Sequence, residues 1–477
     1  MKILFVASEV APFAKTGGLA DVTGSLPHEL KRQGHDVRII MPFYKSAAKA
    51  DFLIRKIRKS VEIQLGGALF KGLLRHTVQD DIPVYLLENK DLFFRDHLYG
   101  GPAGDYPDNA TRFAFFCRGV LELLKRMDYR PDVLHCHDWQ SAMVPILMRY
   151  ELAEDPFFAA MAVVLTIHNL AYQGLFPVEA LDKMGLDRSY FSIDRLEFYG
   201  KVNLLKGGIL AADQVNTVSE SYCGEILTPE EGCGLDGVLG TRRDALSGIL
   251  NGIDHATWDP ANDRELFRNY SASAPAGKAA NKRGVQKLLG LPQESGVPLV
   301  GMVSRMIAQK GFDLIEPLLP DFAAGELQLA VIGSGEEKYV KMFDDICAAG
   351  AGNIVLREGF DQALARKIYA ASDIFLMPSH FEPCGLGQLI ALRYGAVPVV
   401  RRTGGLKDTV VDETTNGREQ NGFCFDEYAP EALWAALKRA IETYRDRDKW
   451  KKIVRRGMSC DFSWRQSAMK YEDLYRR

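Results

Sequence analysis

The loop SHFEPCGLGQ, residues 379–388, places a carboxylate beside a run of small residues. Glu382 supplies the carboxylate, and backbone N–H groups at the start of a predicted helix come from Cys384, Gly385 and Leu386. Carboxylates accept hydrogen bonds from hydroxyl groups, whereas N–H groups at a helix start attract phosphate. The loop therefore predicts a site for a sugar nucleotide, which carries both groups. The alternative is that Glu382 only stabilises the helix N-terminus.

A second loop, SRMIAQKG at residues 304–311, contributes two cations. Arg305 and Lys310 follow an apolar run and lie in one short loop, so both can reach one diphosphate at the end of a strand. A solvated pair of loop charges explains the same spacing equally well.

The stretch KTGGLAD, which begins at Lys15, has the composition of a phosphate-binding turn. Lys15 adds a full charge, and Gly17 and Gly18 let backbone N–H groups approach a ligand. We expect the following helix to begin near Asp21. A tight strand-to-helix turn without a ligand is the commoner explanation for an isolated Gly-Gly pair. The pattern T-G-G-L-x-D recurs at residues 403–408, so it marks either two sites or two walls of one.

Histidines and a carboxylate end two further apolar runs. HCHDW supplies His135, His137 and Asp138, and TIHNLAYQG supplies His168 and Asn169. His135 and His137 share one face of a strand, as metal ligands can. No nearby Cys or Glu completes a tetrahedral set, so we predict no metal site.

Two weaker patterns exclude other ligands. GSGEEKY has Gly333 and Gly335, but Lys338 stands where a third glycine is needed, so a nicotinamide cofactor is not supported. Asp446 and Asp448 form an Asp-x-Asp pair among helical charges. That setting is more typical of a solvated helix face than of a metal-diphosphate site.

Short apolar runs precede these loops and are typical of buried parallel strands. In the first half they are KILFVAS, DVRIIMP, DVLHCHD, MAVVLTIH and QVNTVS, and in the second half PLVGMVS, LQLAVIG, NIVLREG, DIFLMPS and AVPVV. Helical patterns lie between them, at residues 107–127, 139–150, 334–348 and 362–371. The alternation predicts an α/β chain with two doubly wound domains, whose ligands bind at the carboxyl ends of the strands.

The boundary between the domains is predicted within ILNGIDHATWDPAND, residues 249–263, because its turn residues suit a hinge. We expect an N-terminal domain at residues 1–250, a C-terminal domain at 251–460, and a final helix at 461–477 that rejoins the first domain. The patches VEIQL, KGLLRH and IPVYLLE, within residues 46–104, predict antiparallel strands inserted in the N-terminal domain.

The bulk composition excludes several classes of protein. With 477 residues and a formal charge of −3, the chain suits two domains and no nucleic-acid partner. Its eight cysteines form no Cys-x-x-Cys pair, which favours reduced thiols in the cytoplasm. The apolar run ILFVA is too short for a signal peptide, Glu9 follows it closely, and no run is long enough for a membrane span.

Taken in order, these motifs make the sequence closely resemble bacterial glycogen synthases and plant starch synthases. KTGGLADV, HDW, TIHNLAYQG, LNGID, SRMIAQKG, SHFEPCGLGQ and the second TGGL occur in the family's order over nearly the whole chain. The resemblance implies two Rossmann-like domains facing across a cleft, the GT-B fold. It also implies transfer of glucose from ADP-glucose or UDP-glucose to an α-1,4-glucan (glycogen or maltooligosaccharides), with retention of configuration and without metal or cofactor.

The resemblance assigns roles in the C-terminal domain. Arg305 and Lys310 are expected to balance the leaving diphosphate. Glu382 is expected to hold the donor glucose and to stabilise an oxocarbenium-like centre. Backbone donors come from Cys384, Gly385 and Leu386. An aromatic, Phe360, stands where the family stacks a ring on the base, and we expect Thr403 and Gly404 to approach the donor phosphates.

In the N-terminal domain, the resemblance places Lys15, Gly17 and Gly18 near the donor phosphate and sugar. Residues expected to line or support the sugar subsite are Asp21, Tyr99, Asp138, His168, Asn169 and Asn251. Eight residues after Glu382 stands Ile390, so the second carboxylate of the Glu-x7-Glu transferases, which holds the ribose, is absent here.

The retained configuration leaves the reaction path open. Double displacement needs a carboxylate nucleophile, for which Glu382 and Asp138 are the candidates. The resemblance gives both carboxylates binding roles. Our hypothesis is therefore a front-face reaction in which the leaving phosphate oxygen takes the acceptor proton.

Three rival functions are less consistent with the sequence. Another retaining GT-B transferase is disfavoured by the absent second glutamate and the intact KTGGL motif. A pyridoxal-phosphate glucan phosphorylase is typically much longer. A non-catalytic glycan-binding protein would not need every charged motif residue. Between donors, the likeness to bacterial enzymes favours ADP-glucose.

Overall fold

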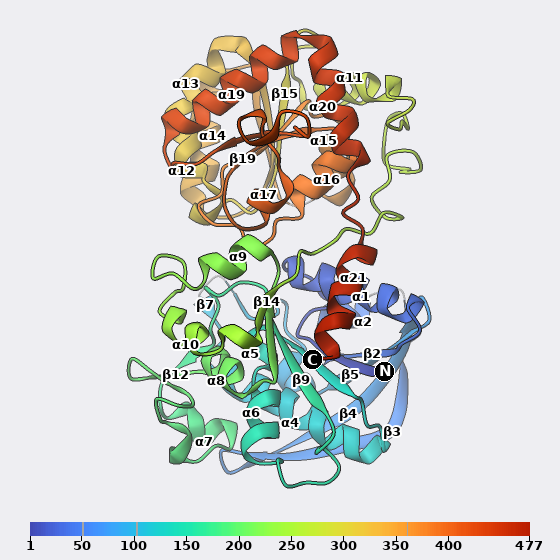
Figure 1. The fold of residues 1–477 in the computed structure, drawn as a ribbon, viewed down its shortest axis with the longest axis vertical. Helices are drawn as coiled ribbons and strands as arrows, with labels where there is room; N and C mark the ends of the chain where they lie inside the picture. Colours follow the sequence, from blue (N-terminus) through green and yellow to red (C-terminus); the bar gives the residue numbers. More distant parts are fainter. Residues whose placement is uncertain (50–51, 102–103, 360) are drawn as a thin grey trace. The chain divides into compact units, whose positions relative to one another are not determined.

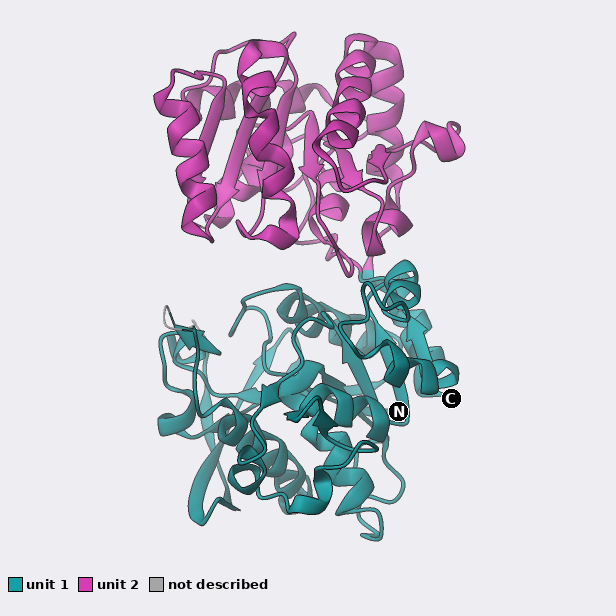
Figure 2. Cartoon of the chain, turned by 90° about the vertical axis from the view of Figure 1, so that its left-hand side faces the viewer, with its two compact units in different colours: residues 1–251, 464–477 teal, residues 252–463 magenta. Residues whose placement is uncertain are grey.

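The computed structural model describes residues 1–49, 52–101, 104–359 and 361–477. The chain forms two compact units (Figure 2). Unit 1 comprises Met1–Asn251 and Trp464–Arg477, and unit 2 comprises Gly252–Ser463. Each unit has its own sheet and its own buried apolar core.

Unit 1 is built on a nine-stranded sheet in the order β14-β13-β9-β8-β1-β2-β5-β4-β3 (Figure 1). The parallel strands predicted from apolar runs are confirmed, and a short sixth strand, β14, joins them. Their bounds are β1 Lys2–Val6, β2 Asp36–Pro42, β8 Val133–His137, β9 Ala162–Ile167, β13 Gln214–Thr217 and β14 Leu246–Gly248.

The predicted antiparallel insertion is confirmed and extends the same sheet. Its strands are β3 Arg55–Leu65, β4 Ala68–Gln79 and β5 Ile82–Glu88. β4 pairs antiparallel with both neighbours, while β5 joins β2 in parallel, with Ile39 opposite Val84. Shorter strands form two separate ribbons, which are β6 Gly100–Gly101 with β7 Gly104–Asp105, and β10 Leu175–Phe176 with β11 Glu197–Phe198 and β12 Lys201–Asn203.

The helices of unit 1 differ from prediction in two places. α1 spans Gly18–Arg32, so it begins at the second glycine of KTGGL and not near Asp21. The pattern at 139–150 forms two helices, α5 Asp138–Ser141 and α6 Met143–Tyr150. The break has a local cause, because Pro145 lacks the N–H that would bond the carbonyl of Ser141.

The other helices of unit 1 are α2 Lys45–Lys49, α3 Lys90–Phe93, α4 Asn109–Met127, α7 Ala180–Met184, α8 Leu204–Ala211, α9 Glu220–Glu225 and α10 Asp236–Thr241. The last helix, α21 Trp464–Tyr475, packs beside α1 (Figure 1). Trp464 and Tyr471 are buried in the core of unit 1, so the chain returns to unit 1 after completing unit 2.

Unit 2 has an all-parallel sheet of six strands in the order β17-β16-β15-β18-β19-β20. The five predicted strands are confirmed, and β20 is added. Their bounds are β15 Leu299–Val303, β16 Gln328–Gly333, β17 Ile354–Glu358, β18 Ile374–Met377, β19 Val397–Arg401 and β20 Phe423–Phe425.

The helices of unit 2 alternate with its strands, and α11 precedes the first strand. They are α11 Ala276–Leu289, α12 Phe312–Ile315, α13 Leu319–Asp321, α14 Glu337–Ala348, α15 Gln362–Ala371, α16 Gly387–Arg393, α17 Gly404–Thr409, α18 Glu413–Asn416, α19 Pro430–Arg445 and α20 Arg447–Ser459. α14 and α15 match the predicted patterns closely.

Both sheets contain a point where the strand order reverses direction. β1 lies between β2 and β8, and β15 lies between β16 and β18. Loops leaving such neighbouring strands diverge, which opens a crevice at the carboxyl ends. The predicted motifs follow these strands: KTGGL follows β1, HDW follows β8, SRMIAQKG follows β15 and SHFEPCGLGQ follows β18.

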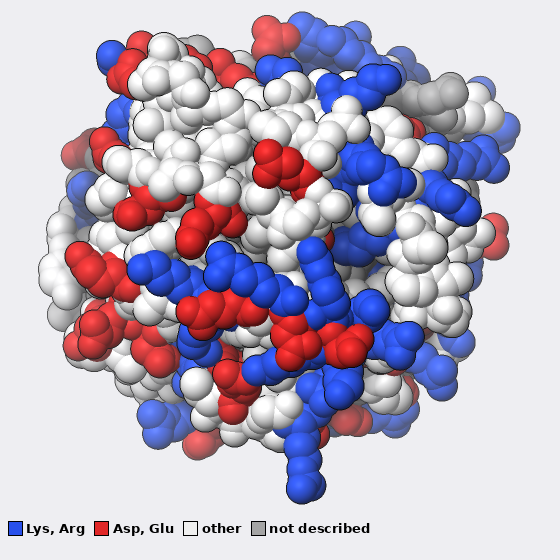
Figure 3. Space-filling model, turned by 90° about the horizontal axis from the view of Figure 1, so that it is seen from above, with Lys and Arg blue, Asp and Glu red and all other residues white. Residues whose placement is uncertain are grey.

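The surface carries both signs of charge. Figure 3 shows acidic and basic side chains interspersed over one face of the molecule. Exposed pairs in unit 2 include Lys449 with Glu413 at 2.7 Å and Lys451 with Asp448 at 3.6 Å. Such pairs contribute about 0–1 kcal/mol each, so they mark ordinary solvated surface. Within the described ranges, no helix has the length and apolar character needed to cross a membrane.

Candidate active site

The two predicted loops of unit 2 meet through a buried ion pair. Lys310 Nζ lies 2.8 Å from Oε1 and 2.6 Å from Oε2 of Glu382. Ser379 donates a further hydrogen bond to Oε2 at 2.8 Å. Both charged side chains are largely shielded from solvent. The sequence predicted both residues in one site but not their pairing, in which the carboxylate offsets the charge of Lys310.

The backbone of these loops is interlocked as well. His380 N donates to Gln309 O at 2.9 Å, and Gln309 Nε2 donates to Phe381 O at 3.2 Å. Arg305 lies at the start of the same loop with an exposed side chain. No hydrogen bond or ion pair holds its guanidinium within the described chain, so this cation is available to a ligand.

Gln388 shapes the turn that follows Glu382. Gly385 has φ +72°, a conformation that favours glycine, and a Cβ there would lie 2.4 Å from Gln388 Oε1. The Gln388 amide donates to Cys384 O at 3.0 Å and to Gly385 O at 2.9 Å. Gln388 is fully buried and was not among the predicted site residues. Leu386 ends the turn before α16.

The backbone of the second TGGL, residues 403–406, packs against the backbone of the Glu382 loop. Gly405 N donates to Glu382 O at 3.2 Å. Gly404 has φ +44°, and a Cβ on it would lie 2.0 Å from Glu382 O. A Cβ on Gly405 would lie 2.1 Å from Cys384 O. Thr403 is buried at the N-terminus of α17. Glycine is therefore required here for close contact between two backbone segments.

The first TGGL is organised differently, around the buried carboxylate of Glu9. Thr16 donates its backbone N–H to Oε2 at 2.5 Å and its hydroxyl to Oε1 at 2.6 Å, and Gly17 N–H lies 3.3 Å from Oε2. Lys15 pairs instead with Asp21 at 2.6 Å. A Cβ on Gly17 would meet no atom within 4 Å. The Gly17 N–H thus points to Glu9, and the exposed Gly18 begins α1.

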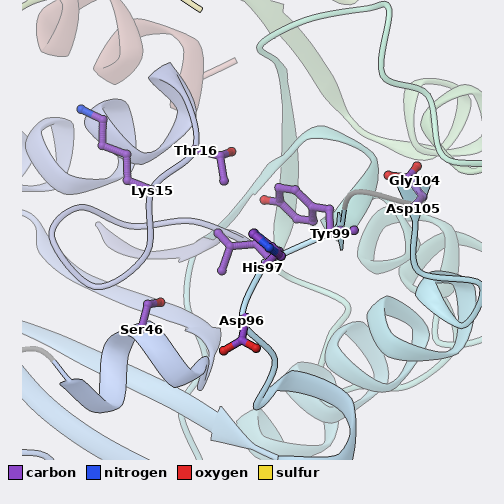
Figure 4. Close-up of a pocket in the computed structure, with 11 residues that line it drawn as sticks. Lys15, Thr16, Ser46, Asp96, His97, Tyr99, Gly104 and Asp105 are labelled. Atoms are coloured by element: carbon purple, nitrogen blue, oxygen red, sulfur yellow. The ribbon is translucent and has the colours of Figure 1, made fainter. Parts of the chain in front are cut away.

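Tyr99 completes this cluster and lines a pocket. Its hydroxyl lies 2.7 Å from Glu9 Oε1 and 2.8 Å from Ser8 Oγ. Burial raises the pKa of Tyr99 well above its ordinary value, so it stays a hydrogen-bond donor. The pocket has a volume of about 490 Å³ and is also lined by Lys15 and His97 (Figure 4). Lys15, predicted from the KTGGL motif, and Tyr99, assigned through the family resemblance, therefore line one cavity.

Asp138 and His168 are held together at the ends of β8 and β9. Asp138 has φ +55°, which is unusual outside glycine, and its Oδ1 accepts the His168 backbone N–H at 2.7 Å. Burial raises the pKa of Asp138 to about 7, and the charge of Glu9 acts in the same direction. Burial lowers the pKa of His168 to about 3, so its ring is neutral near pH 7.

The remaining predicted residues are less closely joined. Asn169 Oδ1 accepts the Ala171 N–H at 3.0 Å, which shapes the loop after β9. Asn251 is buried, and its Oδ1 has no hydrogen-bond partner among the described residues. Phe360 lies outside the described residues. Among those described, no three His, Cys, Asp or Glu side chains cluster closely enough to hold a metal ion.

Glu9 is the main residue that sequence reasoning missed. It counted only as a charge ending the N-terminal apolar run. A signal was present, because a carboxylate directly after the buried strand β1 lies at the carboxyl edge where ligands bind. Its partners, Thr16 and Tyr99, are brought to it by the fold.

Comparison with known proteins places this geometry in a family. Residues 2–241 match the family described as starch synthase catalytic domain, and residues 291–457 match glycosyl transferases group 1. The glycogen synthase of Geotalea uraniireducens is 63% identical over 476 residues, covering 100% of this chain and 98% of the relative. The chain belongs to the starch synthase family.

Other members of the starch synthase family match over the same length. The glycogen synthase of Moorella thermoacetica is 46% identical, with 100% of this chain and 96% of the relative covered. The structure of the catalytic domain of starch synthase IV from Arabidopsis thaliana, bound to ADP and acarbose, is 37% identical with a TM-score of 0.93, covering 100% and 98% of the two chains. The predicted family, the GT-B fold and the glycosyltransferase class are confirmed.

Replacing Glu9 by Gln is expected to lower the free energy of unfolding of unit 1 by about 1–3 kcal/mol, because one amide cannot accept from all the donors that surround this carboxylate. Differential scanning calorimetry measures the change. Glu62→Gln, at an exposed side chain, is the matched control and is expected to have no measurable effect. Equal unfolding temperatures for both variants would contradict the role assigned to Glu9.

The two TGGL motifs predict different responses to the same substitution. Gly404→Ala is expected to lower the free energy of unfolding by at least about 1–2 kcal/mol, because of its positive φ and the clash with Glu382 O. Gly17→Ala, with extended backbone and open space, is expected to change it by less than about 0.5 kcal/mol. Thermal unfolding of the ligand-free variants checks both, and a reversed order would refute the assignment.

Asp138→Asn is expected to change how stability depends on pH. The folded chain holds the Asp138 proton up to about pH 7, whereas the unfolded chain loses it near the ordinary value of 3.8. Ionisation across that window therefore destabilises the wild type, while the Asn variant stays neutral. The stability of the variant relative to wild type should rise from pH 4 to pH 7 in chemical unfolding curves. A difference independent of pH would show that Asp138 titrates normally.

Proposed function

We propose that this chain is a glycogen synthase that transfers glucose from ADP-glucose to the non-reducing end of an α-1,4-glucan, with retention of configuration. The observation that carries the proposal is the full-length match to glycogen synthases, at 63% identity for the relative from Geotalea uraniireducens. The Arabidopsis neighbour, bound to ADP and acarbose, supports the adenine nucleotide and a saccharide acceptor. The free state of all eight cysteines supports a reducing, cytoplasmic setting.

The proposed domains follow the motifs. Residues 1–250, rejoined by the helix at 461–477, form the acceptor side, and residues 251–460 form the nucleotide-sugar side. The acceptor side contributes Lys15, Gly17, Gly18, Asp21, Tyr99, Asp138, His168, Asn169 and Asn251. The nucleotide-sugar side contributes Arg305, Lys310, Glu382, Cys384, Gly385, Leu386, Thr403 and Gly404.

Donor binding exchanges the partners of a buried ion pair. Separating Lys310 from Glu382 without replacement would leave uncompensated buried charge, which is strongly unfavourable. A diphosphate supplies the replacement for Lys310, and the donor glucose hydroxyls supply it for Glu382. A ligand that carries both groups replaces both partners at once, which favours an intact sugar nucleotide over a free sugar or a free diphosphate.

Neither candidate carboxylate is poised as a nucleophile. Both oxygens of Glu382 face Lys310. Burial raises the pKa of Asp138 to about 7, and one of its oxygens accepts the His168 N–H. The front-face path needs no such nucleophile. The bond from the anomeric carbon to the phosphate oxygen breaks, the acceptor hydroxyl oxygen bonds the carbon on the same face, and its proton passes to the leaving phosphate. A trapped glucosyl adduct on Glu382 or Asp138 would overturn this path.

The test is a donor comparison with radiolabelled glucose. Glycogen is offered with ADP-glucose or UDP-glucose, and the labelled product is digested with an α-1,4-specific hydrolase. We expect incorporation from ADP-glucose and release of the label by the hydrolase. No incorporation from either donor would refute the synthase function, and a preference for UDP-glucose would refute the donor assignment.

Lys310→Met is expected to lower kcat/KM for ADP-glucose by about 100-fold, because the cation that balances the leaving diphosphate is lost. Lys407→Met, an exposed lysine on α17, is the matched control and should retain wild-type kinetics. Equal activity in the two variants would remove Lys310 from the site.

A further inference from the structure

Three neighbouring histidines, two of them fully buried, form an array behind the proposed sugar subsite. His135 and His137 come from β8, and His168 follows β9. Ring centroids lie 4.2 Å apart between His135 and His137, and 5.3 Å apart between His137 and His168. Both β8 rings are fully buried, and burial lowers the pKa of each well below its ordinary value. All three rings are therefore neutral, and each carries one proton whose position the neighbours decide.

The proton on His135 is fixed by a chain that ends on α21. Asn216 Nδ2 donates to Tyr471 Oη at 3.1 Å, which leaves Asn216 Oδ1 to accept the Thr166 hydroxyl at 2.6 Å. Thr166 has only one proton, so its oxygen must accept from His135 Nε2, which lies 2.6 Å away. His135 Nδ1 is then bare and accepts the Tyr475 hydroxyl at 2.7 Å. Each polar side-chain atom along this hydrogen-bond chain therefore has a partner.

The position of the proton on His137 follows from the lack of a hydrogen-bond partner for its Nε2 in the described part of the chain. Its Nε2 is buried, and the described residues offer it no hydrogen-bond partner. Its Nδ1 lies 3.0 Å from His168 Nε2. Among buried backbone groups, an N–H without an acceptor is rarer than a carbonyl without a donor, and the same preference is applied here to the ring nitrogens. The proton of His137 therefore lies on Nδ1 and is donated to His168 Nε2.

We propose that His137 is a positioning residue that locks neutral His168 in the tautomer with its proton on Nδ1, so that His168 offers the transferred sugar an uncharged N–H donor. The inference rests on the proposed function, which places His168 beside that sugar. His168 is half-buried, and no side chain or carbonyl of the described residues accepts from its Nδ1. The N–H therefore has its hydrogen-bonding capacity left for a sugar hydroxyl or a phosphate oxygen.

The tautomer matters for the front-face path. A protonated, cationic imidazole would oppose the positive charge that develops at the anomeric carbon, and a bare ring nitrogen would compete with the leaving phosphate for the acceptor proton. A neutral N–H donor does neither. Locking His168 in this form excludes it from general-base catalysis while keeping it as a hydrogen-bond donor.

The direct test is nitrogen-15 NMR of the full chain with labelled histidine, at pH 7. The chain has nine histidines, and the signals of His168 are identified by their loss in His168→Gln. We expect the chemical shift of an unprotonated nitrogen at Nε2 and of a protonated nitrogen at Nδ1. A proton on Nε2 of His168 in the wild type would overturn the proposal.

A pair of substitutions at one position tests the lock itself. In His137→Asn the side-chain amide places an N–H near the original Nδ1, whereas His137→Leu removes the donor. We expect the Leu variant to mix the two tautomers of His168 and to lower kcat by about 10–100-fold, with little change in KM. The Asn variant should restore the wild-type tautomer and most of the activity. Loss of thermal stability in both variants with no change in the His168 signals would mean that His137 is only structural.

Tyr475→Phe is the matched control at the other end of the array. It removes the donor to His135 Nδ1 and is expected to change the His135 signals while leaving those of His168 and kcat unchanged. If the Leu variant does not fold, the wild-type and Asn spectra still decide the question. Full activity in His168→Ala would refute the proposed role of His168 in the reaction, whereas the NMR result stands apart from activity.

Discussion

The parallel pairing of β1 and of β15 with strands on both sides is the constraint on which the candidate site depends. At each of these strands the order of connections reverses, so the flanking loops diverge and leave room for a ligand. Glu9 and Asp138 follow the strands of the first reversal, and Lys310 and Glu382 follow those of the second. These four polar residues therefore lie beyond the carboxyl ends of the apolar strands.

Three buried carboxylates show how differently a protein can satisfy one functional group. Glu9 is saturated by amide and hydroxyl donors, so it fixes the shape of a loop. Glu382 faces the ammonium group of Lys310. Asp138 has few hydrogen-bond donors, and burial disfavours its ionised form and raises its pKa to about 7. The environment, not the residue type, decides each role.

Sequence alone predicted the fold well and the site only in part. Apolar runs marked ten of the strands, because a strand buried on both faces needs a continuous apolar stretch. The pairing of Lys310 with Glu382 joins residues 72 positions apart, and the contact of Tyr475 with His135 spans 340. No local pattern encodes such contacts. The start of α1 was misplaced because the glycines of KTGGL were assigned wholly to a turn, although Gly18 begins the helix.

The return of α21 to unit 1 has a consequence for biosynthesis. Tyr471 and Tyr475 complete a hydrogen-bond chain in which Asn216 precedes Tyr471 by 255 residues and His135 precedes Tyr475 by 340. Residues 252–463 must be synthesised before those partners emerge. Until α21 is translated, Asn216 and His135 lack the tyrosine partners that they have in the finished protein. The finished histidine array belongs only to chains that have been translated through both units.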